Sequence, residues 1–338
     1  MSEIVCVTGA SGFIGAHLVA LLLRAGYHVR ATLSSTDSET RHLRAIAEAA
    51  GAGQLTLHVA NLTHRGGFDS VFDGADHVIH AAASVRLDTP PEELVEVNLG
   101  GTHNVLSSLG KAASVRTLIY TSSLAAVVHD RIGPGHVFDE RDWSRDTPET
   151  DPYAYAKVRS EQMIEEFSDR TRDSVRVVRL QPSLALGPAH SSRPVIAPRF
   201  VAAIAAGALP DLHLCLPFVD VRDIAKAHVA ALQHPTAAGR YVLSAGELWL
   251  HEVAQAIELA EDRVRPQLDM DLDSDLLMYL LFLQDWQMRI CTATENLHRP
   301  IAVNGDRART ELGLDYLPLR QSVLDTLAEH LVDAGAKG

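Results

Sequence analysis

The strongest constraint on the fold is a glycine pattern near the start of the chain, where Gly9, Gly12 and Gly15 stand in the order G-x-x-G-x-x-G. An apolar run, Ile4–Val7, precedes the pattern, and an amphipathic stretch, Phe13–Ala25, follows it. We expect Gly9 to permit the tight turn, Gly12 to let the backbone approach a pyrophosphate, and Gly15 to let the helix pack on the sheet. Free N–H groups at the helix N-terminus favour bound phosphate. The pattern therefore predicts a dinucleotide-binding strand, turn and helix.

Short apolar runs alternate with helical stretches up to residue 180, which is typical of βαβ units around a parallel sheet. The predicted strands are Ile4–Val7, His28–Leu33, Leu55–Ala60, His77–Ala82, Thr117–Ser122 and Val175–Leu180. The predicted helices are Phe13–Ala25, Glu39–Ala50, Pro91–Ala113 and Asp151–Arg170. We therefore expect an α/β fold with a Rossmann doubly wound parallel sheet.

The pattern loosens after Leu180, where prolines at 182, 188, 194, 198 and 210 predict a loop-rich stretch. The elements predicted beyond it are a strand and helix at Val219–His234, a strand at Gly239–Leu243, and helices at His251–Asp262, Leu276–Arg289 and Leu319–Val332. Because no linker separates the two parts, we expect a smaller, interleaved C-terminal substrate domain. The predicted division gives residues 1–180 and about 215–245 to an NAD(P)-binding Rossmann domain, and about 181–214 and 246–338 to the substrate-binding domain.

Composition argues against several classes of function. The net charge of −13 disfavours a general nucleic-acid binder, which needs a basic face. The chain has no apolar run of about 18 residues and no signal-type leader, so we expect a cytoplasmic protein without a membrane partner. Cys6, Cys215 and Cys291 are scattered without metal spacing, and no histidine pair has ligand spacing, so we expect no metal site.

Tyr153 and Lys157 form Y-x-x-x-K on a predicted helix, which puts both side chains on one face. A free tyrosine has a pKa of about 10, and we expect the nearby Lys157 ammonium to lower that pKa. Tyr153 can then exchange a proton with a carbonyl oxygen while hydride moves at the carbon. Ser123 follows the strand Thr117–Ser122 at the edge where ligands bind, so its hydroxyl can hydrogen-bond the same oxygen. Ser122 should point the other way.

The end of the second predicted strand decides between NAD(H) and NADP(H). An acidic residue there would bind the ribose hydroxyls and indicate NAD(H). Here Ser34 and Ser35 follow the strand, which favours NADP(H), with these serines, Arg30 or Arg41 as candidates to contact the 2′-phosphate. Asp37 comes slightly later and could still bind a ribose, so NAD(H) stays open.

The chain resembles the extended short-chain dehydrogenase/reductase (SDR) superfamily, including the NAD-dependent epimerase/dehydratase family, and within it the dihydroflavonol 4-reductase-like group. The matching pieces are Val5–Thr32 (VCVTGASGFIGAHLVALLLRAGYHVRAT), Asn98–Val105 (NLGGTHNV), Leu118–Ser123 (LIYTSS), Tyr153–Lys157, Phe218–His228 (FVDVRDIAKAH), Gly239–Val242 (GRYV) and Glu311–Gly313 (ELG). The resemblance covers nearly the whole chain, and its first and fourth pieces are the most specific.

The resemblance implies an NADP(H)-dependent ketoreductase, or the reverse alcohol dehydrogenase, acting as a monomer or homodimer on a small, largely apolar or secondary-metabolite carbonyl compound. The implied catalytic residues are Ser123, Tyr153 and Lys157. The implied cofactor-binding residues are Gly9, Gly12, Phe13, Ile14, Gly15, Ser34, Arg41, Asn61, Leu62, Ala81, Ala82, Ala83, Tyr153, Lys157, Pro182, Ser183, Leu184 and Ala185. Of these, Asn61 and Leu62 are expected near the adenine, and Pro182–Ala185 near the nicotinamide.

Two other functions stay open. Dehydratases of this superfamily carry an Asp-Glu pair directly after the catalytic hydroxyl, where this chain has Leu124–Ala125. Epimerases carry a Tyr-Gly pair a few residues later, where this chain has Val127–His129. The second alternative is a non-catalytic, cofactor-binding regulator, although such relatives typically lose the tyrosine or lysine that this chain keeps. The apolar segment Leu276–Arg289, with Tyr279 and Trp286, either lines the substrate pocket or belongs to the core of the smaller domain.

Overall fold

Seven parallel strands form the main sheet, in the spatial order β3-β2-β1-β4-β5-β6-β9. The computed structural model describes residues 2–35, 40–51, 54–85, 89–171, 174–190, 196–205, 213–258, 274–296, 298 and 300–335. The strands are β1 (Ile4–Thr8), β2 (His28–Leu33), β3 (Gln54–Val59), β4 (His77–His80), β5 (Thr117–Thr121), β6 (Arg176–Pro182) and β9 (Gly239–Leu243). Because the chain runs outward from β1 in one direction and from β4 in the other, the sheet is doubly wound, and the predicted Rossmann order is confirmed.

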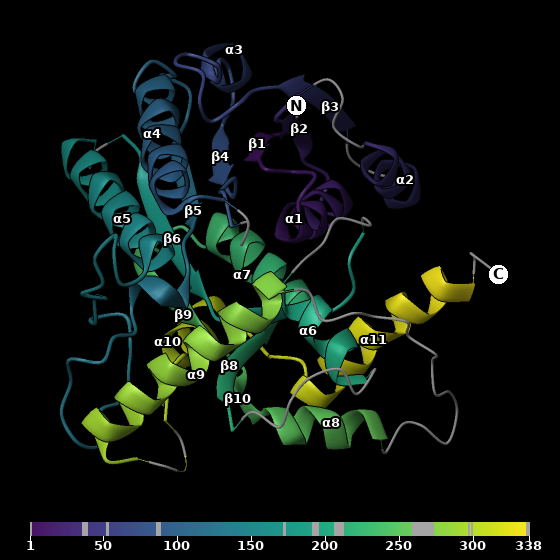
Figure 1. Cartoon of the computed structure of the whole chain (residues 1–338). Helices are drawn as coiled ribbons and strands as arrows, with labels where there is room; N and C mark the ends of the chain where they lie inside the picture. Colours follow the sequence, from purple (N-terminus) through teal and green to yellow (C-terminus); the bar gives the residue numbers. More distant parts are fainter. Residues whose placement is uncertain are drawn as a thin grey trace.

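Helices cover both faces of this sheet. They are α1 (Phe13–Arg24), α2 (Arg41–Ala50), α3 (Asp69–Phe72), α4 (Pro91–Leu109), α5 (Pro152–Arg170), α7 (Val221–Gln233) and α10 (Asp306–Leu312). Figure 1 shows α4 and α5 side by side on one flank of the sheet, and α1 and α2 on the other. The elements predicted before residue 180 are confirmed to within a few residues at their ends, except that Glu39 lies outside the described residues.

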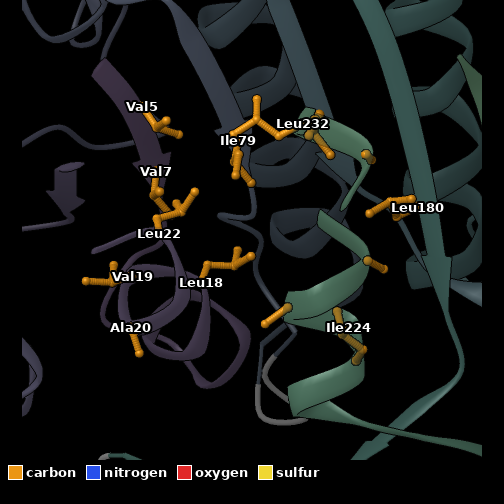
Figure 2. Packing of buried hydrophobic residues seen from close by; sticks show 14 of the residues in the cluster. Val5, Val7, Leu18, Val19, Ala20, Leu22, Ile79, Leu180, Ile224 and Leu232 are labelled. Carbon is orange, nitrogen blue, oxygen red and sulfur yellow. The ribbon is translucent and has the colours of Figure 1, made fainter. Parts of the chain in front are cut away.

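The first strand shows why the sheet needs helices on both faces. Val5 and Val7 belong to the apolar cluster with α1, whereas Cys6, between them, belongs to the cluster on the opposite face. Figure 2 shows the two valines near Leu18 and Leu22 of α1. All five side chains are 0% exposed. Burial on both faces explains why the strand is a continuous apolar run in the sequence.

A second sheet of three strands, in the order β10-β8-β7, packs with its own helices. Its elements are β7 (Leu184–Leu186), β8 (Cys215–Asp220), β10 (Gly246–Trp249), α6 (Ile196–Ala205), α8 (Leu250–Glu258), α9 (Ser274–Thr294) and α11 (Leu319–Gly335). Figure 1 shows these helices gathered below the main sheet. The central strand of the small sheet, β8, lies within the range 215–245. The helix that follows it, α7, packs on the main sheet. The two parts are therefore interleaved, while the exact domain boundaries stay a prediction.

The stretch after Leu180 is more ordered than its prolines predict, because it contains β7 and α6. Leu186 of β7 and Phe200 and Val201 of α6 are buried in an apolar cluster whose other members lie more than a dozen residues away in the sequence. Tertiary packing decides such short elements, and their own periodicity does not reveal them. Pro194, Pro210, residues 206–208 and the end of the predicted helix His251–Asp262 lie outside the described residues.

Within the described ranges, no helix is long and apolar enough to cross a membrane. Across the same residues, no group of three or more His, Cys, Asp or Glu side chains is placed to hold a metal ion. Cys6, Cys215 and Cys291 are all buried.

Candidate active site

The glycine turn lies between β1 and α1, and the structure leaves no room for a side chain at Gly9 or at Gly15. Gly9 has a φ of +69°, and a Cβ there would stand 2.8 Å from the Cα of Ala82. A Cβ on Gly15 would overlap the carbonyl oxygen of Gly9. Gly12 is the N-cap of α1 and has no side chain to satisfy the N–H groups of the first turn. The turn is therefore a cradle of backbone donors at a helix N-terminus, which fits the pyrophosphate of a dinucleotide.

A hydrogen-bond chain ties the segment after β4 to this turn. The Thr8 hydroxyl accepts from the N–H of Ala82 at 3.1 Å and lies 2.8 Å from Nδ1 of His80. Burial lowers the pKa of His80 to about 3, so the imidazole is neutral at physiological pH. These hydrogen bonds hold the predicted contact residues Ala81–Ala83 beside Gly9.

Ser123, Tyr153 and Lys157 come together at the carboxyl end of β5. The side chain of Asp151 caps the N-terminus of α5, which carries the tyrosine and the lysine. The Ser123 hydroxyl lies next to the Tyr153 phenol and acts to lower its pKa. The Lys157 ammonium lies 5.7 Å from the centre of the Tyr153 ring and donates to the backbone oxygen of Thr121 at 3.0 Å. The three predicted residues thus form one group at the edge of the sheet that also holds the glycine turn.

Burial sets the protonation states in this group. It raises the pKa of Tyr153 to about 12, although the Ser123 hydroxyl acts in the opposite direction. It lowers the pKa of Lys157 to about 8, against the attraction of the Glu161 carboxylate. The expected fall in the pKa of Tyr153 is therefore wrong for this structure, because desolvation of the phenol dominates. At neutral pH the site holds a protonated phenol beside a cationic amine.

The end of β2 has no acidic side chain among its described residues. Ser34 and Ser35 are exposed there, and Arg41 is the exposed first residue of α2. Arg30 is directed elsewhere, because its guanidinium donates to two backbone oxygens in and just after α3, at 2.8 and 2.6 Å. Asp37, the alternative partner of a ribose, lies outside the described residues.

Asn61 joins the ends of β2 and β3. Its amide nitrogen donates to the backbone oxygen of Ser34 at 3.3 Å, and its amide oxygen accepts from the N–H and the hydroxyl of Thr63, both at 3.0 Å. The amide oxygen of Asn61, a residue expected near the adenine, is therefore already engaged with Thr63. The next residue, Leu62, is held by a hydrogen bond from the Asn104 side chain to its carbonyl oxygen at 2.7 Å.

The segment Pro182–Ala185 runs from the end of β6 into β7. The N–H of Ser183 donates to the backbone oxygen of Leu243 at 2.9 Å, which places this segment next to β9. The Ser183 hydroxyl is buried, and it has no hydrogen-bond partner among the described residues. A buried polar group of this kind normally has a partner, so this hydroxyl fits a place beside a polar group of a bound cofactor.

Helix α9 lies over the segment that follows Ser123. Trp286 packs against the small-domain core and also against a second apolar cluster that contains Phe138. Burial raises the pKa of Tyr279, and its electrostatic interaction with Tyr153 adds to this shift, which places the two phenols in the same neighbourhood. Helix α9 therefore belongs to the core of the small domain, and it also extends toward the catalytic group.

Sequence reasoning missed two buried groups beside the site, Glu161 and His80. Glu161 follows Lys157 by four residues on α5, and this continuation of the Tyr153–Lys157 spacing was a usable signal. His80 carried no signal beyond its position at the end of a predicted strand.

Comparisons with known proteins agree with this geometry. Residues 5–244 match the NAD dependent epimerase/dehydratase family. A cinnamoyl-CoA reductase of Medicago truncatula is 30% identical over 336 residues, which cover 97% of this chain and 95% of that protein. A bifunctional dihydroflavonol 4-reductase/flavanone 4-reductase of Malus domestica is 31% identical over 271 residues, or 76% of each chain. Gre2 of Candida albicans, solved in complex with NADPH, superposes with a TM-score of 0.78 at 22% identity, over 98% of this chain and 99% of that one, and so shares the fold.

Proposed function

Because this chain belongs to the NAD-dependent epimerase/dehydratase family of extended short-chain dehydrogenases/reductases, we propose that it is an NADP(H)-dependent oxidoreductase. It reduces a ketone or an aldehyde, or oxidises the corresponding alcohol, with Ser123, Tyr153 and Lys157 as its catalytic residues. The names of its relatives support this proposal, since both the Medicago and the Malus proteins are called reductases.

One observation carries the proposal: the phenol of Tyr153 lies beside the buried ammonium of Lys157, which is 5.7 Å from the centre of the phenol ring, and beside the hydroxyl of Ser123. All three groups lie at the edge of the sheet where β1 ends in the phosphate cradle. A proton donor, a second hydroxyl and a cation are the groups that carbonyl reduction needs around the substrate oxygen.

The chain's own residues perform the proton transfer. The phenol of Tyr153 keeps its proton at neutral pH because burial raises its pKa, so it can give that proton to a carbonyl oxygen. The Ser123 hydroxyl donates a hydrogen bond to the same oxygen. The Lys157 cation then stabilises the phenolate that remains. Bound NADPH supplies the hydride that the carbonyl carbon accepts.

The cofactor site runs along the carboxyl ends of the strands. The backbone of Gly9–Gly15 would hold the pyrophosphate, Ala81–Ala83 would line the cofactor, and Pro182–Ala185 would lie near the nicotinamide. Two exposed side chains, Ser34 at the end of β2 and Arg41 at the start of α2, lie where a 2′-phosphate would bind. The absence of an acidic side chain among the described residues there supports NADP(H) over NAD(H).

The proposed substrate is largely apolar. The segment after Ser123 is apolar and buried, with Leu124, Val127 and Val128 all under 9% exposed, and Trp286 packs against it. The buried Leu124 and its neighbour Ala125 have no group that could act as an acid or a base. This supports reduction over the elimination carried out by dehydratases.

The test is turnover by the purified protein with NADPH, and separately with NADH, against aliphatic and aromatic ketones and aldehydes. We expect NADPH consumption that falls by about 10²-fold or more in Tyr153→Phe, since the proton donor is lost. Tyr155→Phe, on the same helix, is the matched control and should keep full activity. Tight NADPH binding without turnover of any carbonyl compound or alcohol would refute the proposal, and nucleotide sugars would then test the epimerase alternative.

A further inference from the structure

Three consecutive residues at the end of β5 each face one residue of α5. We call this set the β5–α5 clamp: the Thr121 backbone oxygen accepts from the Lys157 ammonium at 3.0 Å, the Ser122 hydroxyl donates to the Glu161 carboxylate at 2.5 Å, and the Ser123 hydroxyl lies next to the Tyr153 phenol. Because the three helix residues are four positions apart, they lie on one face of α5. Two of the pairs contain proposed catalytic groups, and the Ser122–Glu161 pair has no part in the proposed proton transfer.

The Glu161 carboxylate is fully buried and tightly held. It is 0% exposed, and it accepts from the Ser122 hydroxyl, from the Gln181 amide at 3.0 and 3.1 Å, and from Nε of Arg240 at 2.8 Å. A carboxylate is tolerated inside a protein only with such partners, because its desolvation is costly. The partners come from the end of β5, from β6 and from β9, so one side chain of α5 joins all three strands.

Arg240 extends the same network to the segment that follows Ser123. Its guanidinium is 5% exposed and donates to the backbone oxygens of Ala126, Glu140 and Asp142, at 3.3, 2.7 and 2.5 Å. The segment that leaves the site is therefore anchored to the same buried ion pair as the helix that carries the proposed proton donor.

We infer that Glu161 is a positioning residue, whose carboxylate holds Ser122, and through it Ser123, in register with Tyr153. The inference rests on the proposed function, because it concerns the same catalytic group. The Ser123 hydroxyl itself accepts from the N–H of Ala125 at 3.2 Å, and the adjacent Ser122 is the residue that joins this turn to Glu161 of α5. A displacement of about 1 Å in a group of this kind can cost on the order of 10²-fold in rate.

The variant Ser122→Ala tests this role with little risk to folding. It removes one hydrogen bond, while Glu161 keeps its bonds to Gln181 and Arg240. We expect kcat to fall on the order of tenfold, because Ser123 loses its fixed position. The KM and the Kd for NADPH should stay unchanged, because the phosphate cradle lies at the end of β1. Ser122→Thr keeps the hydroxyl and should restore most of the lost kcat.

Ser108→Ala is the matched control. Ser108 of α4 is 1% exposed, and its hydroxyl donates to the Asp69 carboxylate at 2.6 Å, so the variant also deletes a serine–carboxylate bond, here to a side chain that is 40% exposed. We expect Ser108→Ala to lose no more thermal stability than Ser122→Ala, with the fall in kcat confined to Ser122→Ala.

Two outcomes would overturn the inference, and they are distinguishable. If the wild-type protein reduces carbonyl compounds and Ser122→Ala keeps its kcat, Glu161 is only structural, and the proposed function stands. If the wild-type protein shows no carbonyl reduction, the proposed function fails, and the positioning role fails with it.

Discussion

Lys157 should lower the stability of this protein while serving its activity. The side chain is 3% exposed, and burial lowers its pKa from the ordinary 10.5 to about 8. Since one pKa unit corresponds to about 1.4 kcal/mol, keeping the amine charged in the folded protein costs about 3 kcal/mol. Lys157→Met keeps a long side chain and removes the charge. It also loses the hydrogen bond to the Thr121 oxygen, worth about 1 kcal/mol, so we expect a net gain of about 2 kcal/mol at pH 7.

The stability advantage of Lys157→Met over the wild type should decrease as the pH rises. Below pH 8 the lysine is charged in both the folded and the unfolded chain, so the full cost is present. Between pH 8 and 10.5 the folded protein gives up the proton first, so the unfolded chain binds more protons and the wild type gains stability as pH rises. Above pH 10.5 the amine is neutral in both states and the cost disappears. The advantage of Lys157→Met should therefore shrink by about 3 kcal/mol over this range.

Urea denaturation of the wild type and of Lys157→Met, at pH 7 and again near pH 10, measures both effects. Lys111→Met is the control, because that lysine is 61% exposed and should show no comparable pH-dependent gain. In the carbonyl assay, Lys157→Met should lose about 10²- to 10⁴-fold in rate. A variant that is less stable than the wild type at pH 7, or whose advantage is equal at both pH values, would refute the reasoning about burial.

Three further predictions follow from other buried positions. Gly9→Ala should lower the free energy of unfolding by about 2 kcal/mol or more and weaken NADPH binding, because its φ of +69° and the 2.8 Å approach to Ala82 both oppose a Cβ. Gly26→Ala, with a φ of +84° and open space around it, should show only the smaller loss from strain in the same denaturation and titration assays. Burial lowers the pKa of His228 to about 4, so the unfolded chain binds its proton first and stability should fall as pH drops from 6.5 to 4. His228→Gln should remove about 3 kcal/mol of that fall, and an unchanged acid sensitivity in urea denaturation would contradict the prediction. Burial raises the pKa of the Cys6 thiol to about 12, so a thiol reagent should not modify it at neutral pH until the chain unfolds, and rapid labelling of the native protein would argue otherwise.

Local chemistry in the sequence determined much of the fold and the outline of the site. The glycine spacing predicts positions in the turn that cannot carry a side chain. The structure shows why, since a Cβ on Gly9 or Gly15 would meet backbone atoms. The four-residue spacing of Tyr153 and Lys157 follows from helix geometry alone. The alternation of apolar runs and helical stretches is enough for a parallel sheet, because strands buried on both faces need helices on both sides.

Tertiary structure decided everything that depends on contacts between distant residues. Helix α6 and strand β7 form because other elements bury their apolar side chains. The prolines in and around these elements predicted a loop instead. The pKa of Tyr153 is raised where the Y-x-x-x-K spacing predicted a fall, because desolvation depends on what surrounds the phenol. The Glu161 carboxylate finds its partners 39, 20 and 79 residues away in the chain. Spacing along a helix or strand reports which side chains share a face, but burial and long-range hydrogen bonds exist only after the strands have been brought together.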